Sequence, residues 1–208
     1  MQNSYDLIAD KWHANFRGEP YVARVLGYVD RILNDLPPGA TVLDLGCGTG
    51  RPIAKYVVQR GFRLIGVDQS KSMLALARLE VPEGEFIHAD MVDVDLKDRF
   101  AAAIAWDSVF HVERRYHSAL YRKLANSLDQ GGRLLLSVGG SEAQNTLSNE
   151  VDAEGFTSEM FGHPFFYSGY EPNISRKLLE AAGFEIELWE VDDPSSRGHI
   201  AVIGRKLR

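Results

Sequence analysis

The stretch TVLDLGCGTGRP, residues 41–52, places three glycines at every second position directly behind an apolar run. The run TVLDL predicts a buried strand, and Pro52 predicts the start of a helix. Gly46, Gly48 and Gly50 would let bare backbone pass within contact distance of a ligand at the carboxyl edge of a sheet. An ordinary tight turn needs fewer glycines. We therefore expect a ligand-binding loop here.

Outward from this loop, apolar runs of strand length alternate with segments of helical period. This order is typical of a parallel sheet with helices on both faces, and a hairpin at the end of the chain would make the last strand antiparallel. We predict an α/β fold with a doubly wound, mostly parallel, seven-stranded Rossmann-like sheet. The predicted strands are 41–45, 62–68, 85–90, 101–106, 133–138, 184–191 and 199–206. The predicted helices are 21–36, 51–60, 70–80, 113–128 and 173–183. A Gly131-Gly132 pair is expected to close the helix over 113–128.

We expect the whole chain, 1–208, to form a single domain, because 208 residues with 45% apolar content suit one core. Residues 1–38 should form helices that precede the sheet. Residues 139–172 are rich in glycine, serine, asparagine and aromatic residues and show little periodicity. This segment predicts an insertion or lid over the carboxyl edge of the sheet.

Composition argues against several classes of partner. A net charge of −6 disfavours general attraction to nucleic acid or to an anionic membrane. No apolar run is long enough to cross a membrane, and the start of the chain lacks a leader pattern. Cys47 is the only cysteine, so no intrachain disulfide is possible. We expect a soluble, cytoplasmic protein, and no residue grouping has the spacing that predicts a metal site.

The spacing of the loop narrows the ligand class. It reads G-x-G-x-G, whereas a dinucleotide fingerprint reads G-x-G-x-x-G, and Arg51 stands where the last glycine of that fingerprint would fall. The loop therefore suits a nucleoside ligand without a pyrophosphate better than it suits a dinucleotide.

The residues VLDLGCGTGRP closely resemble the first motif of the class I S-adenosylmethionine-dependent methyltransferases, and the likeness extends through most of the chain. It implies S-adenosylmethionine as the cofactor and methyl transfer to a small-molecule acceptor. By this resemblance the glycine loop, including Cys47, would pass under the methionyl part of the cofactor. Asp44 would hold the loop and the cofactor ammonium group.

The ends of the next two strands supply further candidate cofactor residues. In the family, an acid at the position of Asp68 accepts both ribose hydroxyls, although a strand-end turn or a helix cap would also explain this residue. Gln69 would then lie near the ribose or adenine edge. Met73 would pack on the adenine face or belong to the core. Asp90 matches the position that accepts from the adenine amino group, or it caps the segment that follows.

Four further residues complete the expected cofactor site. By the resemblance, Met91 would offer a backbone N–H to adenine, and a carbonyl near Trp106 would face the cofactor amino group. Tyr5 and Trp12 match positions on a helix that closes over the methionine end of the cofactor. The alternative for these two aromatic residues is a helix docked by its apolar stripe.

The expected reaction is an in-line displacement at the sulfonium methyl group, in which the protein aligns the reactants and supplies a base if the acceptor must lose a proton. His111, just beyond the fourth strand, is the first candidate for that base, although it could be a structural histidine. His163 and Tyr167, in the insertion, are the next candidates, and a small core under a loop is their alternative explanation. The run Ala105-Trp106-Asp107-Ser108 lacks the Asn/Asp-Pro-Pro-aromatic run of base methyltransferases, which disfavours nucleic acid as acceptor.

Two other functions stay open from the sequence. One is a nicotinamide-dependent oxidoreductase, against which the missing third glycine argues. The other is a non-catalytic module that binds S-adenosylmethionine for regulation or assembly.

Overall fold

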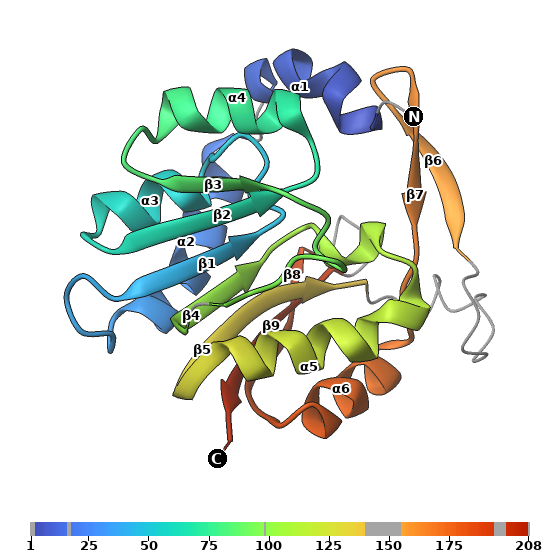
Figure 1. Ribbon diagram of the computed structural model, residues 1–208. Helices are drawn as coiled ribbons and strands as arrows, with labels where there is room; N and C mark the ends of the chain where they lie inside the picture. The colour runs from blue at the N-terminus through green and yellow to red at the C-terminus, as the bar shows by residue number, and fades with distance from the viewer. Residues whose placement is uncertain (1–2, 16–17, 98, 140–154, 194–198, 208) are drawn as a thin grey trace.

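The structure is a computed structural model that describes residues 3–15, 18–97, 99–139, 155–193 and 199–207. Helices and strands alternate along most of the chain (Figure 1). The helices are α1 (Ser4–Ala14), α2 (Glu19–Leu33), α3 (Ile53–Gln59), α4 (Lys71–Glu80), α5 (His117–Ser127) and α6 (Pro172–Ala181), with short 3₁₀ turns at η1 (Val109–His111) and η2 (Arg114–Tyr116). The strands are β1 (Thr41–Leu45), β2 (Arg63–Asp68), β3 (Glu85–His88), β4 (Phe100–Ala105), β5 (Leu128–Val138), β6 (Phe156–Met160), β7 (His163–Tyr167), β8 (Phe184–Asp193) and β9 (His199–Lys206).

Seven strands form one sheet in the order β3-β2-β1-β4-β5-β9-β8. The first five of these are parallel to one another, and β9 runs antiparallel between β5 and β8. This confirms the predicted α/β, mostly parallel sheet with an antiparallel last strand. The chain order reverses between β1 and β4, which is where open sheets of this kind bind ligands.

Each face of the sheet has its own apolar core. On one face, Leu43 of β1 packs with Leu120 and Leu124 of α5. On the other face, Val42 packs with α2 and α3. Alternate residues of β1 therefore serve opposite cores, as the period of a strand requires. Helices on both faces leave the carboxyl edge of the parallel strands free for a site (Figure 1).

A third, smaller core lies at that edge. Ile8 and Ala9 of α1 pack with Met73 of α4 and Phe165 of β7. The hydroxyl of Ser4 also donates to the carbonyl of Pro164 at 2.8 Å, so α1 is attached to both α4 and the hairpin of β6 and β7. These elements surround the end of the sheet toward which β1 and β2 point (Figure 1).

Two boundaries differ from the sequence prediction. The Gly131-Gly132 pair does not close a helix but lies inside β5, because α5 already ends at Ser127. The segment expected to be a helix over 113–128 begins instead with a 3₁₀ turn. Of the expected lid at 139–172, residues 140–154 lie outside the described residues, and 156–167 form an antiparallel hairpin.

No helix in the described part of the chain is long and apolar enough to cross a membrane.

Candidate active site

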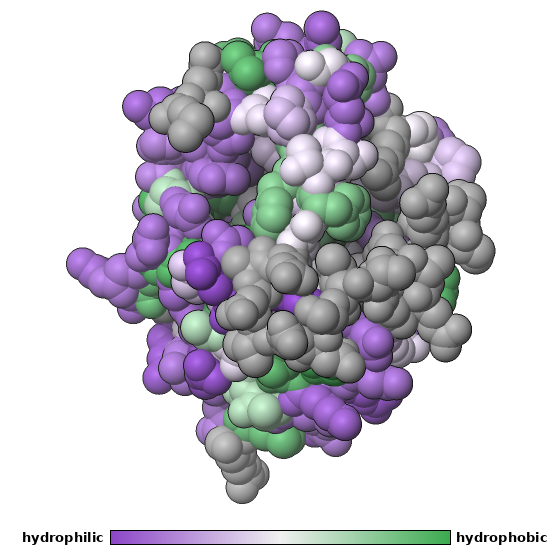
Figure 2. All heavy atoms as spheres, turned by 90° about the vertical axis from the view of Figure 1, so that its right-hand side faces the viewer, coloured by the Kyte–Doolittle hydropathy of each residue, from purple (hydrophilic) through white to green (hydrophobic). Residues whose placement is uncertain are grey.

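A cavity of about 310 Å³ lies at the carboxyl ends of β1, β2 and β4, beside α1. Figure 2 looks onto this edge of the sheet and shows hydrophobic residues near the centre of the face, with hydrophilic residues around them. Most of the predicted site residues line the cavity: Tyr5, Trp12, Asp44, Gly46, Cys47, Gly48, Asp68, Gln69, Met73, Asp90, Met91, Trp106 and His111. Gly50, His163 and Tyr167 do not line it in the structure.

The three glycines of the loop have different roles. All three have positive φ, at +84°, +53° and +80° for Gly46, Gly48 and Gly50. A Cβ at Gly46 would lie 2.4 Å from the Cβ of Ser108, and one at Gly50 would lie 3.2 Å from Val81, so both are required by packing. A Cβ at Gly48 would meet nothing within 4 Å. Gly48 is therefore the glycine whose missing side chain leaves room in the cavity.

Asp68 ties the loop to the next helix. One carboxylate oxygen accepts the N–H of Gly48 at 2.9 Å, and the other accepts the N–H of Ser70 at 2.8 Å. Burial raises the pKa of Asp68, and the two N–H bonds lower it only in part. Ser70 in turn caps α4 by accepting the N–H of Met73. Asp68 thus makes the contact of a strand-end turn, one of the two local alternatives considered for it, while it also lines the cavity.

Asp44 is the most buried acid of the cavity, with 3% of its surface exposed. Burial, followed by the charge of Asp68, raises the pKa of Asp44 to about 7. Among the described residues no hydrogen bond reaches its carboxylate. A buried carboxyl group of this kind favours a cationic ligand, because a cation restores the charged form.

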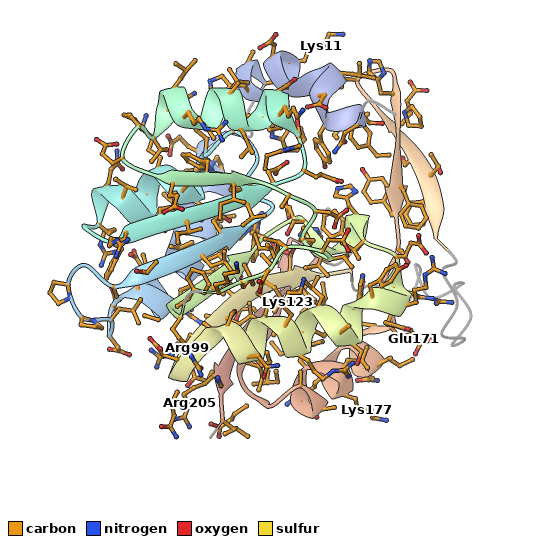
Figure 3. The ribbon with its side chains drawn as sticks, viewed as in Figure 1. Lys11, Arg99, Lys123, Glu171, Lys177 and Arg205 are labelled. Carbon is orange, nitrogen blue, oxygen red and sulfur yellow. The ribbon has the colours of Figure 1, made fainter. Side chains whose placement is uncertain are left out.

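The segment after β3 is held by a residue that the sequence prediction missed. The ammonium group of Lys123, on α5, donates to the carbonyls of Met91 at 3.3 Å and Val94 at 2.9 Å and also to that of Val92. Figure 3 labels Lys123 where α5 lies against the sheet. Asp90 is exposed and accepts the N–H of Val92 at 2.8 Å, so it makes the predicted local cap while it lines the cavity.

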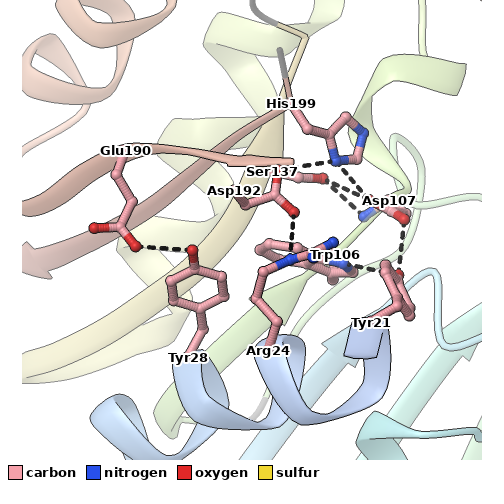
Figure 4. A network of polar contacts seen from close by, with 9 residues as sticks. All are labelled: Tyr21, Arg24, Tyr28, Trp106, Asp107, Ser137, Glu190, Asp192 and His199. Carbon is pink, nitrogen blue, oxygen red and sulfur yellow. Dashed lines mark hydrogen bonds and ion pairs between the residues drawn. The ribbon is translucent and has the colours of Figure 1, made fainter. Parts of the chain in front are cut away.

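A polar network backs the wall formed by Trp106 (Figure 4). The indole N–H of Trp106 donates to the hydroxyl of Tyr21 at 3.0 Å, and this hydroxyl donates to Asp107 at 2.9 Å. Asp107 has φ +51°, an uncommon conformation for a residue with a side chain. Its N–H donates to the hydroxyl of Ser137 at 2.8 Å, and His199 lies 3.3 Å from its carboxylate.

The Asp107 network joins residues of α2, β5 and β9 and the turn after β4 at one point (Figure 4), and its Tyr21, Trp106 and Asp107 line the cavity. Sequence reasoning assigned no role to Tyr21, Asp107 or His199. The positive φ at Asp107 was the missing signal, and no sequence pattern reveals it. The network fixes the turn that carries Trp106 and Ser108 to the cavity wall.

His111 has a partner at each ring nitrogen. Its Nδ1 lies 2.8 Å from the carbonyl of Phe166, and its Nε2 lies 2.8 Å from the hydroxyl of Tyr5. A carbonyl can only accept, so Nδ1 carries the proton and Nε2 accepts from the tyrosine hydroxyl. Burial lowers the pKa of His111, against the raising effects of the Phe166 carbonyl and of Asp107.

The two candidates of the insertion lie farther from the cavity. The ring of Tyr167 stacks on Phe110 and Phe156 and lies 4.7 Å from the ring of His111, centre to centre. His163 begins β7, opposite Met160. Their catalytic role stays a prediction, and the stacking favours a packing role for Tyr167. Among the described residues, no group of three or more metal-ligating side chains is arranged to hold a metal ion.

Comparison with known proteins gives one family and many relatives. Residues 42–132 match the model of a family described as a methyltransferase domain. The chain is 28% identical over 118 residues to the dTDP-3-amino-3,4,6-trideoxy-alpha-D-glucopyranose N,N-dimethyltransferase of Streptomyces venezuelae, covering 56% of this chain and 49% of that protein. It is 27% identical over 135 residues to the trans-aconitate 2-methyltransferase of an Acidovorax species, covering 61% of this chain and 50% of that protein.

A solved structure extends the likeness to almost the whole chain. A putative S-adenosylmethionine-dependent methyltransferase from Listeria monocytogenes superimposes with a TM-score of 0.70 at 19% identity, covering 90% of this chain and 100% of that one. The chain spans about half the length of the curated relatives it matches. These findings confirm the predicted resemblance to S-adenosylmethionine-dependent methyltransferases and the predicted fold.

Proposed function

We propose that this chain is an S-adenosylmethionine-dependent methyltransferase that acts on a small-molecule acceptor. One observation carries the proposal: the open space at Gly48 and the acids at the ends of three neighbouring strands, Asp44, Asp68 and Asp90, all line a single cavity. An ordinary turn would not need an empty space beside Gly48, and the matched methyltransferase domain, 42–132, covers all three strand ends.

The cavity suits the cofactor group by group. Asp44, buried and without a described partner, would hold the ammonium group. Asp68 would accept from the ribose hydroxyls with the lone pairs that its two N–H donors leave. The remaining contacts would follow the family pattern. Adenine would lie between Asp90, Met91, Gln69 and Met73. The methionyl part of the cofactor would lie over Gly46, Cys47 and Gly48, and the amino-acid end of this part would lie near Trp106, Tyr5 and Trp12. Gly50 serves the packing of the loop against α4 rather than direct contact.

The bound cofactor supplies a methyl group on a positively charged sulfur, which is already a good leaving group. The chain contributes alignment and a water-poor site. α1, attached to α4 and β7, covers the cavity on one side, and Trp106 forms the wall behind it. His111 remains our candidate for proton removal when the acceptor must lose a proton.

The charges of the cavity favour an uncharged or amine acceptor. Beyond the acids assigned to the cofactor, the described lining contributes Asp107, which lies 3.3 Å from His199, and Glu113, which pairs with Arg115 at 2.7 Å. Its one cation, Arg51, already pairs with Glu80 at 2.6 Å. Of the two relatives described above, the Streptomyces protein is named for an amino sugar and the Acidovorax protein for trans-aconitate. Because Arg51 is already paired, the described lining offers no cation for a carboxylate acceptor, which favours the first kind of acceptor.

A binding experiment and an activity screen test this function. S-adenosylhomocysteine should raise the thermal midpoint of the protein, whereas NADH should not. The protein should then release S-adenosylhomocysteine when given S-adenosylmethionine and a library of amines and alcohols. Stabilisation by NADH alone would indicate the oxidoreductase. Tight cofactor binding with no methyl transfer across a broad library would indicate a non-catalytic binding module.

We also propose that residues 1–208 form one domain, that the hairpin of β6 and β7 serves as part of the expected lid, and that the protein works in the cytoplasm without a nucleic acid partner. Support for the compartment comes from Cys47, a free and buried thiol inside the proposed cofactor loop. Burial raises the pKa of Cys47 well above its ordinary value, which keeps the thiol protonated and unreactive.

A further inference from the structure

The single turn that follows β3 is held at both of its ends. At its start, one carboxylate oxygen of Asp90 accepts the N–H of Val92 at 2.8 Å, and the Asp90 carbonyl accepts the N–H of Val94 at 2.9 Å. At its end, the carbonyls of Met91, Val92 and Val94 all accept from the ammonium group of Lys123. An acid at the start and a cation at the end are the charges that the backbone dipoles of a helical turn favour.

The turn offers an acceptor and a donor to the cavity. Asp90 and Met91 both line the cavity. Among the described residues, neither the second carboxylate oxygen of Asp90 nor the N–H of Met91 has a hydrogen-bond partner. On the edge of adenine an amino group donates and the adjacent ring nitrogen accepts, whereas hypoxanthine carries an oxygen acceptor and a protonated nitrogen at the same two places. The turn therefore suits adenine and opposes hypoxanthine.

Lys123 reaches the turn from a helix that the core holds in place. Leu120 and Leu124, on the same helix, are buried in the core between α5 and the sheet. An ammonium group has three N–H donors, so the three carbonyls of the turn can use all of them. Burial lowers the pKa of Lys123. Three neighbouring acids favour its charged form: Asp93, Asp90 and Asp95.

We propose that Lys123 is a positioning residue through which the cavity selects adenine over hypoxanthine as the base of the cofactor. The proposal rests on the methyltransferase function proposed above and concerns the cofactor, not the methyl acceptor. Lys123 is absent from the described lining of the cavity, so it acts through the turn. Its bonds to the three carbonyls hold the Asp90 carboxylate and the Met91 N–H at the spacing at which one base can meet both.

The turn also has apolar contacts that do not involve the ammonium group. A Cβ at Gly46 would lie 3.4 Å from the Cε of Met91, so the side chain of Met91 lies beside the glycine loop. Val94 is buried in the same core as Leu120 and Leu124. Loss of the Lys123 ammonium group should therefore loosen the polar edge of the turn while the domain stays folded.

Affinities for two ligands that differ only in the base test this role. Calorimetry measures the dissociation constants of S-adenosylhomocysteine and S-inosylhomocysteine. The wild type should prefer the adenine ligand at least about 100-fold, because the inosine ligand leaves both polar groups of the turn unpaired. Lys123→Met should weaken binding of the adenine ligand about 10- to 100-fold and change binding of the inosine ligand less than about threefold.

Arg122→Met is the matched control, because it removes the same charge at the next position of α5. Arg122 is exposed, and its guanidinium group donates to Ser118 and not to the turn. Both of its affinities should equal those of the wild type. Lys123→Gln keeps N–H donors without the charge, so its preference for adenine should fall between those of the wild type and Lys123→Met. This variant carries the test if Lys123→Met does not fold.

Three results would overturn the positioning role. Equal weakening of both ligands by Lys123→Met would mean that Lys123 only supports the structure. A wild-type preference for adenine kept by Lys123→Met, or by Lys123→Gln where the methionine variant does not fold, would mean that the turn does not need the ammonium group. A wild type that binds both ligands equally would mean that the turn does not recognise the base. A wild type that binds neither ligand would contradict the proposed function itself, and this inference with it.

Discussion

At the scale of single residues, Gly48 and Gly61 form a matched pair. Both have positive φ, at +53° and +84°, and a Cβ at either would meet nothing within 4 Å. Alanine at either position therefore brings backbone strain without a clash. The difference lies in their surroundings, since Gly48 lines the cavity and Gly61 closes α3 on the far side of the loop. Comparing alanine variants at these two positions therefore separates the effect of backbone strain from the effect of a side chain that fills space in the cavity.

We predict that Gly48→Ala weakens S-adenosylmethionine binding at least tenfold, whereas Gly61→Ala leaves it unchanged. Both variants should lose about 1–2 kcal/mol of unfolding free energy, because a side chain at positive φ costs roughly that amount. Calorimetry and denaturant unfolding provide the two measurements. Equal affinities in the two variants would mean that the cofactor does not approach Gly48. Valine would be a poorer probe, because a β-branched residue at this φ is strained far more.

Prediction from the sequence worked best for residues whose role is local. The glycine spacing and the strand-end acids were readable because each of them stands within a few residues of the point where a strand gives way to the segment that follows it. Lys123 and His199 could not be found this way, because each reaches its partners from a distant part of the chain. The partner of His111 was missed for the same reason: Tyr5 lies 106 positions away in sequence.

At the scale of elements, α1 is the piece that connects the two halves of the proposed site. Asp6 accepts the hydroxyl of Ser70 at 2.6 Å and the N–H of Ser72 at 3.0 Å. Ser70 also donates its N–H to Asp68, so one chain of hydrogen bonds runs from the loop through the start of α4 to α1. Burial alone would raise the pKa of Asp6, but these two serines lower it below its ordinary value.

We predict that Asp6→Ala loosens α1 and weakens both cofactor binding and turnover, because α1 carries Tyr5 and Trp12 of the proposed cofactor site. Loss of two hydrogen bonds to a charged acceptor should cost about 1.5–3 kcal/mol and speed amide exchange in α1 at least tenfold. Since the folded pKa is lowered, this docking is complete above the ordinary pKa of 3.8 and is lost as pH falls through the lowered folded value. Hydrogen exchange by mass spectrometry measures it.

Asp10→Ala is the control for this helix, because Asp10 is an exposed acid on α1 outside the cap and the docking contacts. A surface substitution of this kind should change stability by less than about 0.5 kcal/mol. Identical exchange of α1 in the two variants would rule out docking through Asp6.

The order of the elements was predictable, but some of their ends were not. The alternation of strand and helix patterns predicted the sheet, because each pattern repeats over a whole element. The Gly131-Gly132 pair looked like a helix stop, yet β5 begins at Leu128 and contains both glycines. Leu128 pairs with Phe100 of β4, and this long-range pairing extends the strand before the glycines. The register then shifts before Ala102 pairs with Arg133, and Gly131 has φ +76°, so the glycines form an irregularity inside the strand and not a helix stop.

At the scale of the whole molecule, two buried groups have opposite effects on acid stability. Burial raises the pKa of Asp44 to about 7 from 3.8, so the folded state holds a proton that the unfolded state releases, and stability grows as pH falls from about 7 to about 4. Burial lowers the pKa of His117 to about 4 from 6.5, despite the carbonyl of Val112 that its Nε2 contacts. The unfolded state then takes up a proton first, and stability declines over almost the same range.

We predict that these two contributions largely cancel in the ligand-free wild type and separate in single variants. At about 1.4 kcal/mol per pKa unit, Asp44 adds about 4 kcal/mol and His117 removes about 3 kcal/mol between pH 7 and pH 4. Relative to wild type, Asp44→Asn should therefore lose stability as pH falls. His117→Gln, which keeps an N–H donor for Val112, should gain it. Denaturant unfolding at each pH gives the difference curves. Variant curves that run parallel to that of the wild type would mean that neither group titrates as its burial requires. Saturating S-adenosylhomocysteine should abolish the Asp44 contribution, because its ammonium group would keep that carboxylate charged.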